Sequence, residues 1–279
     1  MDLTRQDFDR LNAILAGRIG VAYPASRMSL LSTRLIPRLS ATGTRTFSGY
    51  IRFLERAGSE AMAEEMRQVA PLVTNQESYF FRETWQTEAL IREGLQTLPG
   101  WDSGKLRMLC AGCCRGEEPY TLGILLRKHG GRWSGKEIAI SAFDLVADRL
   151  DAARKATYGP NALRAVSQEH VCTYFERAGG EAYRLKEAHR GEIRFFPGNL
   201  LDPATYSAPL GYDVVFCRNV LLYFSAGARA EVAGHLWAVL KPGGVLCLGH
   251  SESLEGIPHG FESFRLGRSI VYRKAALPP

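Results

Sequence analysis

A polar stretch from Cys217 to Phe224 directly follows the apolar run Tyr212–Phe216. The run is rich in β-branched and aromatic residues and stops at polar ones, which predicts a buried strand. Such a strand delivers Arg218, Asn219 and Tyr223 to its carboxyl end, the edge of an open α/β sheet at which ligands bind. The stretch is therefore a candidate binding or catalytic segment, compatible so far with any nucleotide-binding fold.

A glycine turn between a predicted strand and a predicted helix points to the kind of ligand. Gly112 and Gly116 let the backbone approach a ligand closely, and we expect Gly112 to contact the cofactor. The dinucleotide pattern G-x-G-x-x-G is missing, and Glu117 and Glu118 at the helix start would repel a pyrophosphate. S-adenosylmethionine has no phosphate, and its ammonium and sulfonium groups suit an acidic pair. The alternative is that both glutamates only stabilise the helix dipole.

Two further polar positions follow predicted strands. Asp144 ends the strand Ile138–Phe143 and lies 32 residues after Gly112, whereas about 20 residues are typical of a nicotinamide site. A carboxylate in this position can accept hydrogen bonds from both ribose hydroxyls. Asn199 and Leu200 follow Ile193–Phe196, where an Asn side chain near an adenine edge can both donate and accept.

The elements that must position these residues follow from apolar periodicity. Residues 1–70 carry apolar residues at helical spacing and predict a small all-helical domain. Residues 71–100 form a linker, and in residues 101–279 strands and helices alternate, which predicts an α/β domain with a parallel sheet. Residues 174–196 interrupt the alternation and predict a small antiparallel β insert.

The expected segments of the α/β domain are, as strands, Leu106–Ala111, Ile138–Phe143, Tyr212–Cys217, Val245–Gly249 and Ser269–Arg273, and, as helices, Glu118–His129, Leu145–Thr157 and Ala226–Leu240, with a turn at Lys241–Gly244.

Composition limits the class of protein. The chain has 279 residues, 46% of them hydrophobic and 23% charged, enough for one large and one smaller domain. No apolar stretch approaches the roughly 20 residues that span a bilayer, and the N-terminus lacks the apolar centre of a signal peptide. We therefore expect a cytoplasmic protein without membrane insertion, with its six cysteines as reduced thiols. Cys110-x-x-Cys113 has no second C-x-x-C, so no metal site is expected.

Positive charge is concentrated near the N-terminus. Six arginines and no Asp or Glu occur from Arg18 to Arg52, in a chain of formal net charge +6. Among them, Arg27, Arg34 and Arg38 are spaced seven and four residues apart, on one face of an expected helix. This charge predicts an acidic partner, whereas a solvated helical face is the alternative. No zinc finger or RNA- or DNA-binding module accompanies it, so nucleic acid is not expected.

Five ordered segments resemble motifs of the chemotaxis-receptor glutamate methyltransferases, the CheR family. Thr74–Glu83 resembles "TTNET-x-FFRE", Gly116–Tyr120 "GEEPY", Asn199-Leu200 "NL", Phe216–Phe224 "FCRN-x-x-x-YF", and Gly249–Leu254 "GHSESL". The resemblance covers nearly the whole chain. It implies a Rossmann-like S-adenosylmethionine methyltransferase sheet with a small N-terminal all-helical domain and a small antiparallel β insert, which agrees with the organisation expected above.

The resemblance also implies residue roles. The family's cofactor contacts for S-adenosylmethionine, or the product S-adenosylhomocysteine, fall on Gln76, Ser78, Arg82, Glu117, Asp144, Asn199, Leu200, Arg218 and Asn219. The family usually has Asn and Thr at the first two positions, and a Cys-Ser-Thr-like run in place of residues 113–115. These exchanges keep hydrogen-bonding capacity but change its reach, so cofactor affinity is expected to differ. The segment 177–183 looks shorter than in members that bind a receptor's C-terminal pentapeptide, which predicts a pentapeptide-independent enzyme.

The implied reaction needs no general base. A glutamate side chain, with an ordinary pKa of about 4.3, is already ionised at neutral pH. The enzyme must supply alignment, removal of water and restraint of the carboxylate. Arg82 and Tyr223 suit that task as catalytic residues, because a guanidinium can fork onto a carboxylate and a phenol can donate a further bond. The alternatives are that Arg82 pairs only with the cofactor carboxylate and that Tyr223 only packs.

The methylated glutamates of a chemoreceptor lie on the long acidic helical bundle of its cytoplasmic domain. Arg27, Arg34 and Arg38 are therefore expected to bind this substrate by electrostatic steering, with the enzyme acting as a monomer. Two alternatives stay open. The chain is a methyltransferase for another acidic protein or a small molecule, or it is a regulatory module that binds the cofactor without turnover. His250-Ser251-Glu252 lacks a nucleophile elbow, so hydrolysis is not expected.

Overall fold

The computed structural model describes residues 3–99, 101, 104–130, 135–206 and 211–275. Its N-terminal part is all helical, as expected, with α1 (Arg5–Ile19), α2 (Met28–Ala41), α3 (Phe47–Arg56) and α4 (Ser59–Val73). α1 begins after Thr4, whose hydroxyl accepts a hydrogen bond from the Asp7 amide, and ends at Gly20 in the left-handed conformation. These helices bury a core of their own that includes Leu11, Leu35 and Tyr50.

The helical domain extends slightly beyond its expected end at residue 70. α4 continues through Pro71 to Val73, and both the amide and the hydroxyl of Thr74 bond to the Ala70 carbonyl. Pro71 lies in the last turn, where a missing amide donor disturbs few helical bonds. The linker to the sheet domain therefore begins at Thr74.

The second domain is built on a seven-stranded sheet in the order β6-β2-β1-β7-β8-β10-β9. Five neighbouring strands, β6, β2, β1, β7 and β8, pair in parallel, and β10 pairs antiparallel to β8 and β9. Their bounds are β1 (Lys105–Ala111), β2 (Glu137–Asp144), β6 (Ile193–Pro197), β7 (Tyr212–Cys217), β8 (Leu240–Leu248), β9 (Phe261–Leu266) and β10 (Ser269–Lys274). The strand order reverses direction between β1 and β7, the switch point at which open α/β sheets bind ligands.

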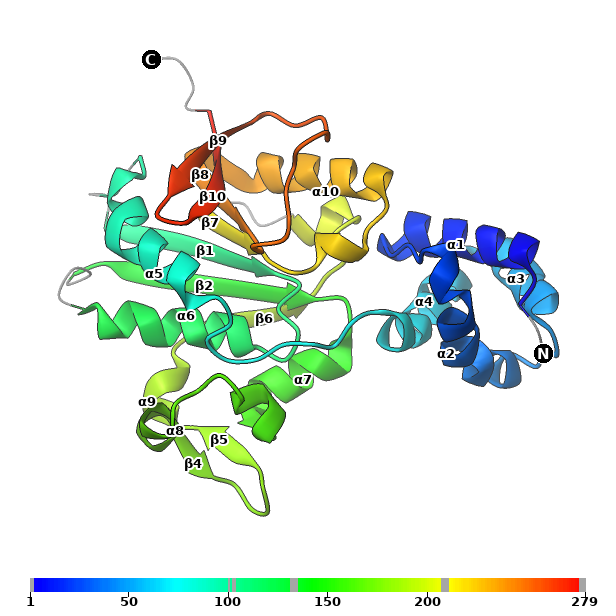
Figure 1. Ribbon diagram of the computed structural model, residues 1–279, viewed down its shortest axis with the longest axis horizontal. Coiled ribbons are helices and arrows are strands. Elements are labelled where there is room, and N and C mark those ends of the chain that lie inside the picture. Colours follow the sequence, from blue (N-terminus) through cyan, green and yellow to red (C-terminus); the bar gives the residue numbers. More distant parts are fainter. Residues whose placement is uncertain (1–2, 100, 102–103, 131–134, 207–210, 276–279) are drawn as a thin grey trace.

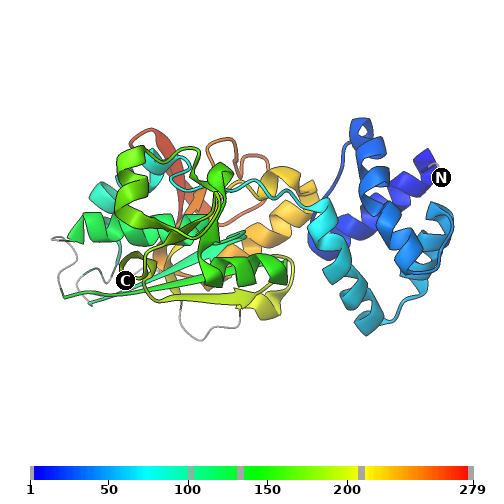
Figure 2. The same ribbon diagram turned by 90° about the horizontal axis from the view of Figure 1, so that it is seen from below.

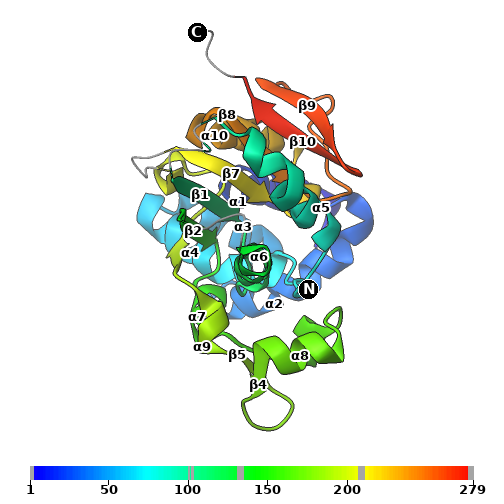
Figure 3. The ribbon, with the colours of Figure 1, turned by 90° about the vertical axis from the view of Figure 1, so that its left-hand side faces the viewer.

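Helices cover both faces of this sheet, as Figure 3 shows. Along β7, Val214 and Phe216 join a core with α6 (Glu117–Lys128) and the helical segment from α5 (Thr84–Ala89) to Leu95. Val215 and Cys217 point to the other face and pack with α10 (Ala226–Val239). All six residues of β7 are buried, which explains its continuous apolar run. The predicted α/β class and Rossmann-like sheet are confirmed.

Two sequence predictions about this domain are wrong. The expected turn at Lys241–Gly244 lies inside β8, as an irregularity in its pairing with β7. Ile193–Phe196, expected in the antiparallel insert, belongs to β6 and pairs in parallel with β2 at the edge of the main sheet. The short, half-buried pattern of this segment does not reveal which sheet it joins, because pairing depends on residues distant in sequence.

The antiparallel insert itself is present and begins earlier than expected. β3 (Thr157–Tyr158), β5 (Tyr183–Leu185) and β4 (Phe175–Arg177) form a three-stranded sheet in that order. α7 (Ala147–Lys155) precedes this subdomain, and α8 (Gln168–Tyr174) and α9 (Glu187–Arg190) belong to it. It lies below the sheet domain in Figure 1.

The helical domain lies beside the sheet domain, near α10, and the linker 74–83 runs between the two in Figures 1 and 2. Val21 and Phe224 form an isolated antiparallel bridge across the boundary. Gly20 is required there, because its φ is +80° and an added Cβ would lie 2.2 Å from the Phe224 ring. The segment that follows β7 is thus in direct contact with the helical domain.

Candidate cofactor and active site

A cleft opens at the carboxyl ends of the parallel strands, at the switch point between β1 and β7. The space between its walls is about 1170 Å³, which includes the solvent at its open mouth. Its walls come from the ends of β1, β2 and β7, the linker, the segment after β6 and the end of α1. Site residues predicted from sequence that line it are Ser78, Arg82, Gly112, Asp144, Asn199, Leu200, Arg218, Asn219 and Tyr223.

A cluster of ion pairs closes the inner end of the cleft. Arg218, with only 3% of its side chain exposed, pairs through Nη2 with Glu83 and through Nη1 with Glu118, each at 3.0 Å. The amide of Asn219 donates to Glu252 at 2.6 Å. We call Glu83, Glu118, Arg218, Asn219 and Glu252 the ion-pair cluster. Arg218 thus holds two carboxylates, and Glu83 also lies 3.8 Å from Arg82 Nε and 2.6 Å from His250 Nδ1.

The two carboxylates that pair with Arg218 differ in the direction of their pKa shifts. Burial acts to raise the pKa of Glu83, but the Arg218 charge and hydrogen bonds from His250 outweigh it, so the pKa lies below its usual value. Burial raises the pKa of Glu118, against the opposing charge of Arg218. Glu83 and Asn219 both adopt left-handed backbone conformations, with φ of 50° and 60°. Non-glycine residues in this region are held there by surrounding structure and concentrate at functional sites.

The acidic pair after the glycine turn is divided between two roles. Glu118 lines the cleft, but Glu117 does not. The Glu117 carboxylate is buried and accepts hydrogen bonds from the Arg115 amide and the Ser78 side chain. Burial raises the pKa of Glu117. Glu117 thus bonds to Ser78, which lines the cleft, but does not line the cleft itself. Its predicted contact with the cofactor stays a prediction.

The opposite end of the cleft is formed by β2 and the segment after β6. Asp144 is buried and accepts from the amides of Cys114 and Val146 at 2.9 and 3.0 Å, with Arg149 at 3.5 Å. Burial raises the pKa of Asp144, opposed by the Arg149 charge. The Asn199 amide group donates to the Arg18 carbonyl at 2.8 Å, which joins the cleft to α1. The predicted position of Asp144 at the end of β2 is confirmed.

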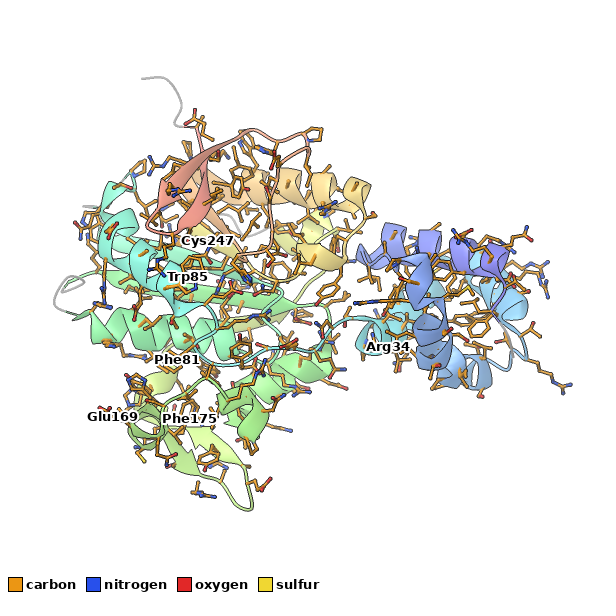
Figure 4. The ribbon with its side chains drawn as sticks, viewed as in Figure 1. Arg34, Phe81, Trp85, Glu169, Phe175 and Cys247 are labelled. Carbon is orange, nitrogen blue, oxygen red and sulfur yellow. The ribbon has the colours of Figure 1, made fainter. Side chains whose placement is uncertain are left out.

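The linker supplies one long side of the cleft. Arg82 lines it and donates to the Glu77 carbonyl at 3.2 Å. Gln76, expected to contact the cofactor, does not line the cleft. Its amide group donates to the Pro71 carbonyl and its oxygen accepts from Arg115. Phe80 and Phe81 anchor this segment to α6 and the subdomain, where Phe81 stacks on His170 in the region labelled in Figure 4.

Tyr223 stands at the mouth of the cleft and is half-buried. It ends the short 3₁₀ turn Leu221–Tyr223, and its carbonyl accepts from the Ala22 amide at 2.8 Å. Its hydroxyl accepts a hydrogen bond from the amide group of Asn75. Sequence reasoning did not single out Asn75, Glu83 or Glu252, although all three lie in or next to the motifs quoted above.

Arg34 and Arg38 lie four residues apart in α2, as expected, whereas Arg27 precedes this helix, and the three arginines differ in their surroundings. Arg27 is exposed and precedes α2, at the end of a 3₁₀ turn. Arg34 donates to the Tyr23 hydroxyl at 2.9 Å and lies on the side of the helical domain that faces the sheet domain (Figure 4). Arg38 forms a two-bond ion pair with the buried Glu65, at 2.9 and 2.6 Å. Its charge is thus compensated inside the domain, and of the three only Arg27 is a freely exposed charge among the described contacts.

The cleft suits a cationic nucleoside on three structural grounds. Gly112 has φ of +79°, and an added Cβ would lie 2.8 Å from Val220, so only glycine leaves the backbone open there. Arg82 and Arg218 line the cleft, and the buried Nε atom of each has no hydrogen-bond partner among the described residues, so both guanidinium groups keep unused donor capacity. Glu118 and Asp144 face the cleft as acceptors.

Fold and cleft define a Rossmann-like methyltransferase that uses S-adenosylmethionine. Residues 76–270 match the family described as CheR methyltransferase, SAM binding domain, and residues 6–69 match the CheR methyltransferase all-alpha domain. The chain belongs to the CheR methyltransferase family. None of its described helices is long and apolar enough to cross a membrane.

Curated relatives agree with this assignment over nearly the full length. The chain is 31% identical to chemotaxis protein methyltransferase 2 of Vibrio cholerae, over 98% of this chain and 94% of that one. It is 30% identical to chemotaxis protein methyltransferase 1 of Pseudomonas aeruginosa, over 98% and 99%. The probable biofilm formation methyltransferase WspC of P. aeruginosa is also 30% identical, over 97% of this chain and 63% of WspC.

Proposed function

We propose that the protein methylates glutamate side chains in the cytoplasmic helical domain of methyl-accepting chemotaxis receptors, giving glutamate methyl esters. The relatives named chemotaxis protein methyltransferase support the substrate class. The observation that carries the chemistry is that Arg82 and Tyr223 both line the cleft, Arg82 next to Glu83 of the ion-pair cluster and Tyr223 beside Asn75. Both can hydrogen-bond a carboxylate. Because the proposed substrate is the cytoplasmic domain of a receptor, the reaction would take place in the cytoplasm.

S-adenosylmethionine held in the cleft would supply a methyl group bonded to a sulfonium. Transfer of that methyl group to a carboxylate oxygen would break the carbon–sulfur bond and leave a methyl ester and a neutral thioether. No proton moves, so the protein's part is alignment and desolvation. Asp144, Asn199, Leu200, the Gly112 backbone and Ser78 would hold the nucleoside, with the ion-pair cluster at its amino-acid end. Tyr223 at the mouth and Arg82 beside the ion-pair cluster would restrain the incoming carboxylate.

The experiment is transfer of labelled methyl groups onto purified receptor fragments, with release of the label by mild base as the signature of an ester. We expect Tyr223→Phe to lower kcat by roughly 10- to 100-fold at unchanged cofactor affinity, because one hydrogen bond to a charged group is lost. Tyr120→Phe is the matched control, since its hydroxyl donates to the Ala153 carbonyl away from the cleft. Unchanged turnover in Tyr223→Phe would mean that Tyr223 only packs.

A second proposal concerns receptor binding. Arg27 supports electrostatic steering because its charge is exposed. Arg27→Glu is expected to raise the receptor Michaelis constant most strongly at low salt. Arg268→Glu makes the same change of charge in the β9–β10 turn, remote from the helical domain (Figure 1), and is expected to leave that constant unchanged. Equal effects of the two variants would reject steering by the helical domain.

We also propose that binding does not require a receptor's C-terminal pentapeptide. The short β4–β5 hairpin supports this, because each strand has three residues and offers little edge for an added peptide strand. Receptor fragments with and without the pentapeptide should then be methylated at the same rate. A clear preference for the pentapeptide would reject the proposal.

The alternatives predict different outcomes of the same transfer experiment. Strong cofactor binding without methylation of any cognate receptor would favour another acidic substrate or a regulatory module without turnover. A variant of the first proposal is that the methylated receptors control an output other than motility. The relative named as a biofilm formation methyltransferase supports this variant. Methylation of receptors from such a pathway, and not of motility receptors, would identify it.

A further inference from the structure

The hydroxyl of Tyr223 has one hydrogen-bond partner in the part of the chain that the structure describes, the side-chain amide of Asn75. The oxygen of that amide already accepts from the Glu77 backbone amide at 3.2 Å. The Asn75 nitrogen must therefore face Tyr223, because the opposite orientation would place two donors against each other at Glu77. Asn75 is thus the donor and the Tyr223 oxygen is the acceptor.

This direction has a chemical consequence. A phenol that accepts a hydrogen bond still has its own proton to donate. Within the described residues that proton has no acceptor, and both Tyr223 and Asn75 line the cleft. The proton is therefore available to a group that enters the mouth of the cleft.

Tyr223 is also held through its backbone. Its carbonyl accepts from the Ala22 amide at 2.8 Å, and the next residue, Phe224, forms the bridge with Val21. The helical domain thus fixes the backbone of Tyr223 while the linker fixes its hydroxyl. Asn75 itself is exposed and sits in the linker that joins the two domains.

We propose that Asn75 is a positioning residue, which orients the Tyr223 hydroxyl so that its proton points to the substrate carboxylate. The inference rests on the proposed transfer of a methyl group to a carboxylate. Asn75 does not touch the reacting atoms and moves no proton. It sets the direction of one donor, so that the hydrogen bond to the carboxylate need not be selected from several hydroxyl rotamers at the moment of reaction.

Two substitutions at this position distinguish positioning from packing. Asn75→Asp keeps the shape and the acceptor for the Glu77 amide, but replaces the donor that faces Tyr223 by an acceptor. The Tyr223 proton would then turn toward the aspartate and away from the substrate. Asn75→Ala removes more contacts but leaves the hydroxyl free to rotate. We expect Asn75→Asp to lower kcat at least 10-fold below Asn75→Ala, with cofactor affinity within threefold of the unmodified protein. Equal activity, or a lower activity of Asn75→Ala, would overturn the inference.

A negative charge at position 75 also repels a carboxylate, and a double-substitution cycle separates this effect. In a Tyr223→Phe background there is no hydroxyl proton to redirect, so the difference in kcat between Asn75→Asp and Asn75→Ala should shrink to the part that repulsion causes. Repulsion alone would instead give the same difference between the two variants with or without the Tyr223 hydroxyl, and that result would reject positioning.

A measurement without substrate keeps this test independent of the proposed function. Carbon-13 at the tyrosine ring carbon that bears the hydroxyl reports on its hydrogen bonds, and the Tyr223 signal is assigned by its loss in Tyr223→Phe. We expect this signal to move in Asn75→Asp relative to Asn75→Ala. An unmoved signal would overturn the inference even if receptors are methylated. A moved signal in a protein that methylates no receptor would reject the proposed function and keep the hydrogen bond.

Discussion

The two ends of the cleft are built on different principles. At the inner end, Arg218 is almost fully buried and pairs with Glu83 and Glu118, so charge is balanced by charge. At the mouth, Tyr223 and Asn75 are uncharged, half-buried or exposed, and joined by one hydrogen bond. At the inner end Arg218 has three polar partners, Glu83, Glu118 and the Arg82 carbonyl, whereas at the mouth the Tyr223 hydroxyl has one among the described residues.

We expect the inner end to contribute mainly to the stability of the folded state and the mouth mainly to catalysis. Removing one partner of a buried ion pair leaves an uncompensated charge, which is costly for the folded state. Removing one half-exposed hydrogen bond changes stability little, since water replaces the partner. We therefore expect changes at the inner end to lower stability and cofactor binding together, and changes at the mouth to lower turnover alone.

The largest effect is expected for Arg218→Met. The substitution keeps much of the side-chain volume but removes the one guanidinium that Glu83 and Glu118 share, so that Glu118 loses its ion-pair partner and Glu83 keeps only the more distant Arg82, at 3.8 Å, and His250. The free energy of unfolding should fall by about 3–5 kcal/mol, as measured by urea denaturation, and cofactor binding should be lost. A decrease below about 1 kcal/mol would contradict a folding role for the ion-pair cluster.

A smaller loss of stability is expected for a substitution at Gly112, in the turn after β1 that lines the cleft. Gly112→Ala places a methyl group against Val220 at a φ of +79°, which should cost about 1–3 kcal/mol and weaken cofactor binding measured by calorimetry. Gly123→Ala in α6 is the control, because its added methyl meets nothing closer than 3.9 Å. That control should stabilise the protein by a few tenths of a kcal/mol to about 1 kcal/mol. Equal cofactor affinity in both variants would contradict the close approach at Gly112.

The inner end should also show a defined pH dependence. The pKa of Glu83 is lowered in the folded state, mainly by Arg218 and His250 acting against burial. Its contribution to stability is therefore fully present above the ordinary carboxyl pKa and is lost as pH falls through the lowered value. The difference in unfolding free energy between the unmodified protein and Glu83→Gln should shrink from pH 6 toward about pH 3. A difference that grows on acidification would show the opposite sign of the shift.

The smallest effect on stability is expected at the mouth. Tyr223→Phe and Asn75→Ala should each change the free energy of unfolding by less than about 0.5 kcal/mol, although both lower turnover. Thermal unfolding of the purified variants tests this. A loss of 2 kcal/mol or more in either variant would remove the distinction between the two ends.

Much of this arrangement could be predicted from local pattern. β7 was expected at Tyr212–Cys217 and is found there, because every residue of the strand is buried and the apolar run has the length of a strand. Asp144 was expected at the end of β2 for the same reason. The glycine turn, with Gly112 at positive φ, was also expected, since few other residues adopt that backbone.

Contacts between distant residues could not be predicted. The assignment of Ile193–Phe196 to the insert is wrong, because the pairing of β6 with β2 has no local signature. The pairing of Arg38 with Glu65 joins two helices, and the Gln76 and Glu117 side chains bond to Pro71 and Arg115, which no local pattern reveals. The roles of these three residues toward receptor and cofactor stay predictions.

The stretch after β7 shows what local sequence can indicate and what only the tertiary structure decides. Its residue types and their position at a strand end, properties of a few neighbouring residues, were enough to indicate a ligand site, and its motif was enough to suggest the family. The partners of those residues depend on the fold. Arg218 meets Glu118 and Glu83 across 100 and 135 positions of the chain, and Tyr223 meets Asn75 across 148. Such pairs form only when packing of the sheet, linker and helical domain brings the segments together, because hydrogen bonds and ion pairs act over a few ångströms. The chain therefore shows which groups are available, and the packing shows which of them hold the cofactor end and which face the substrate.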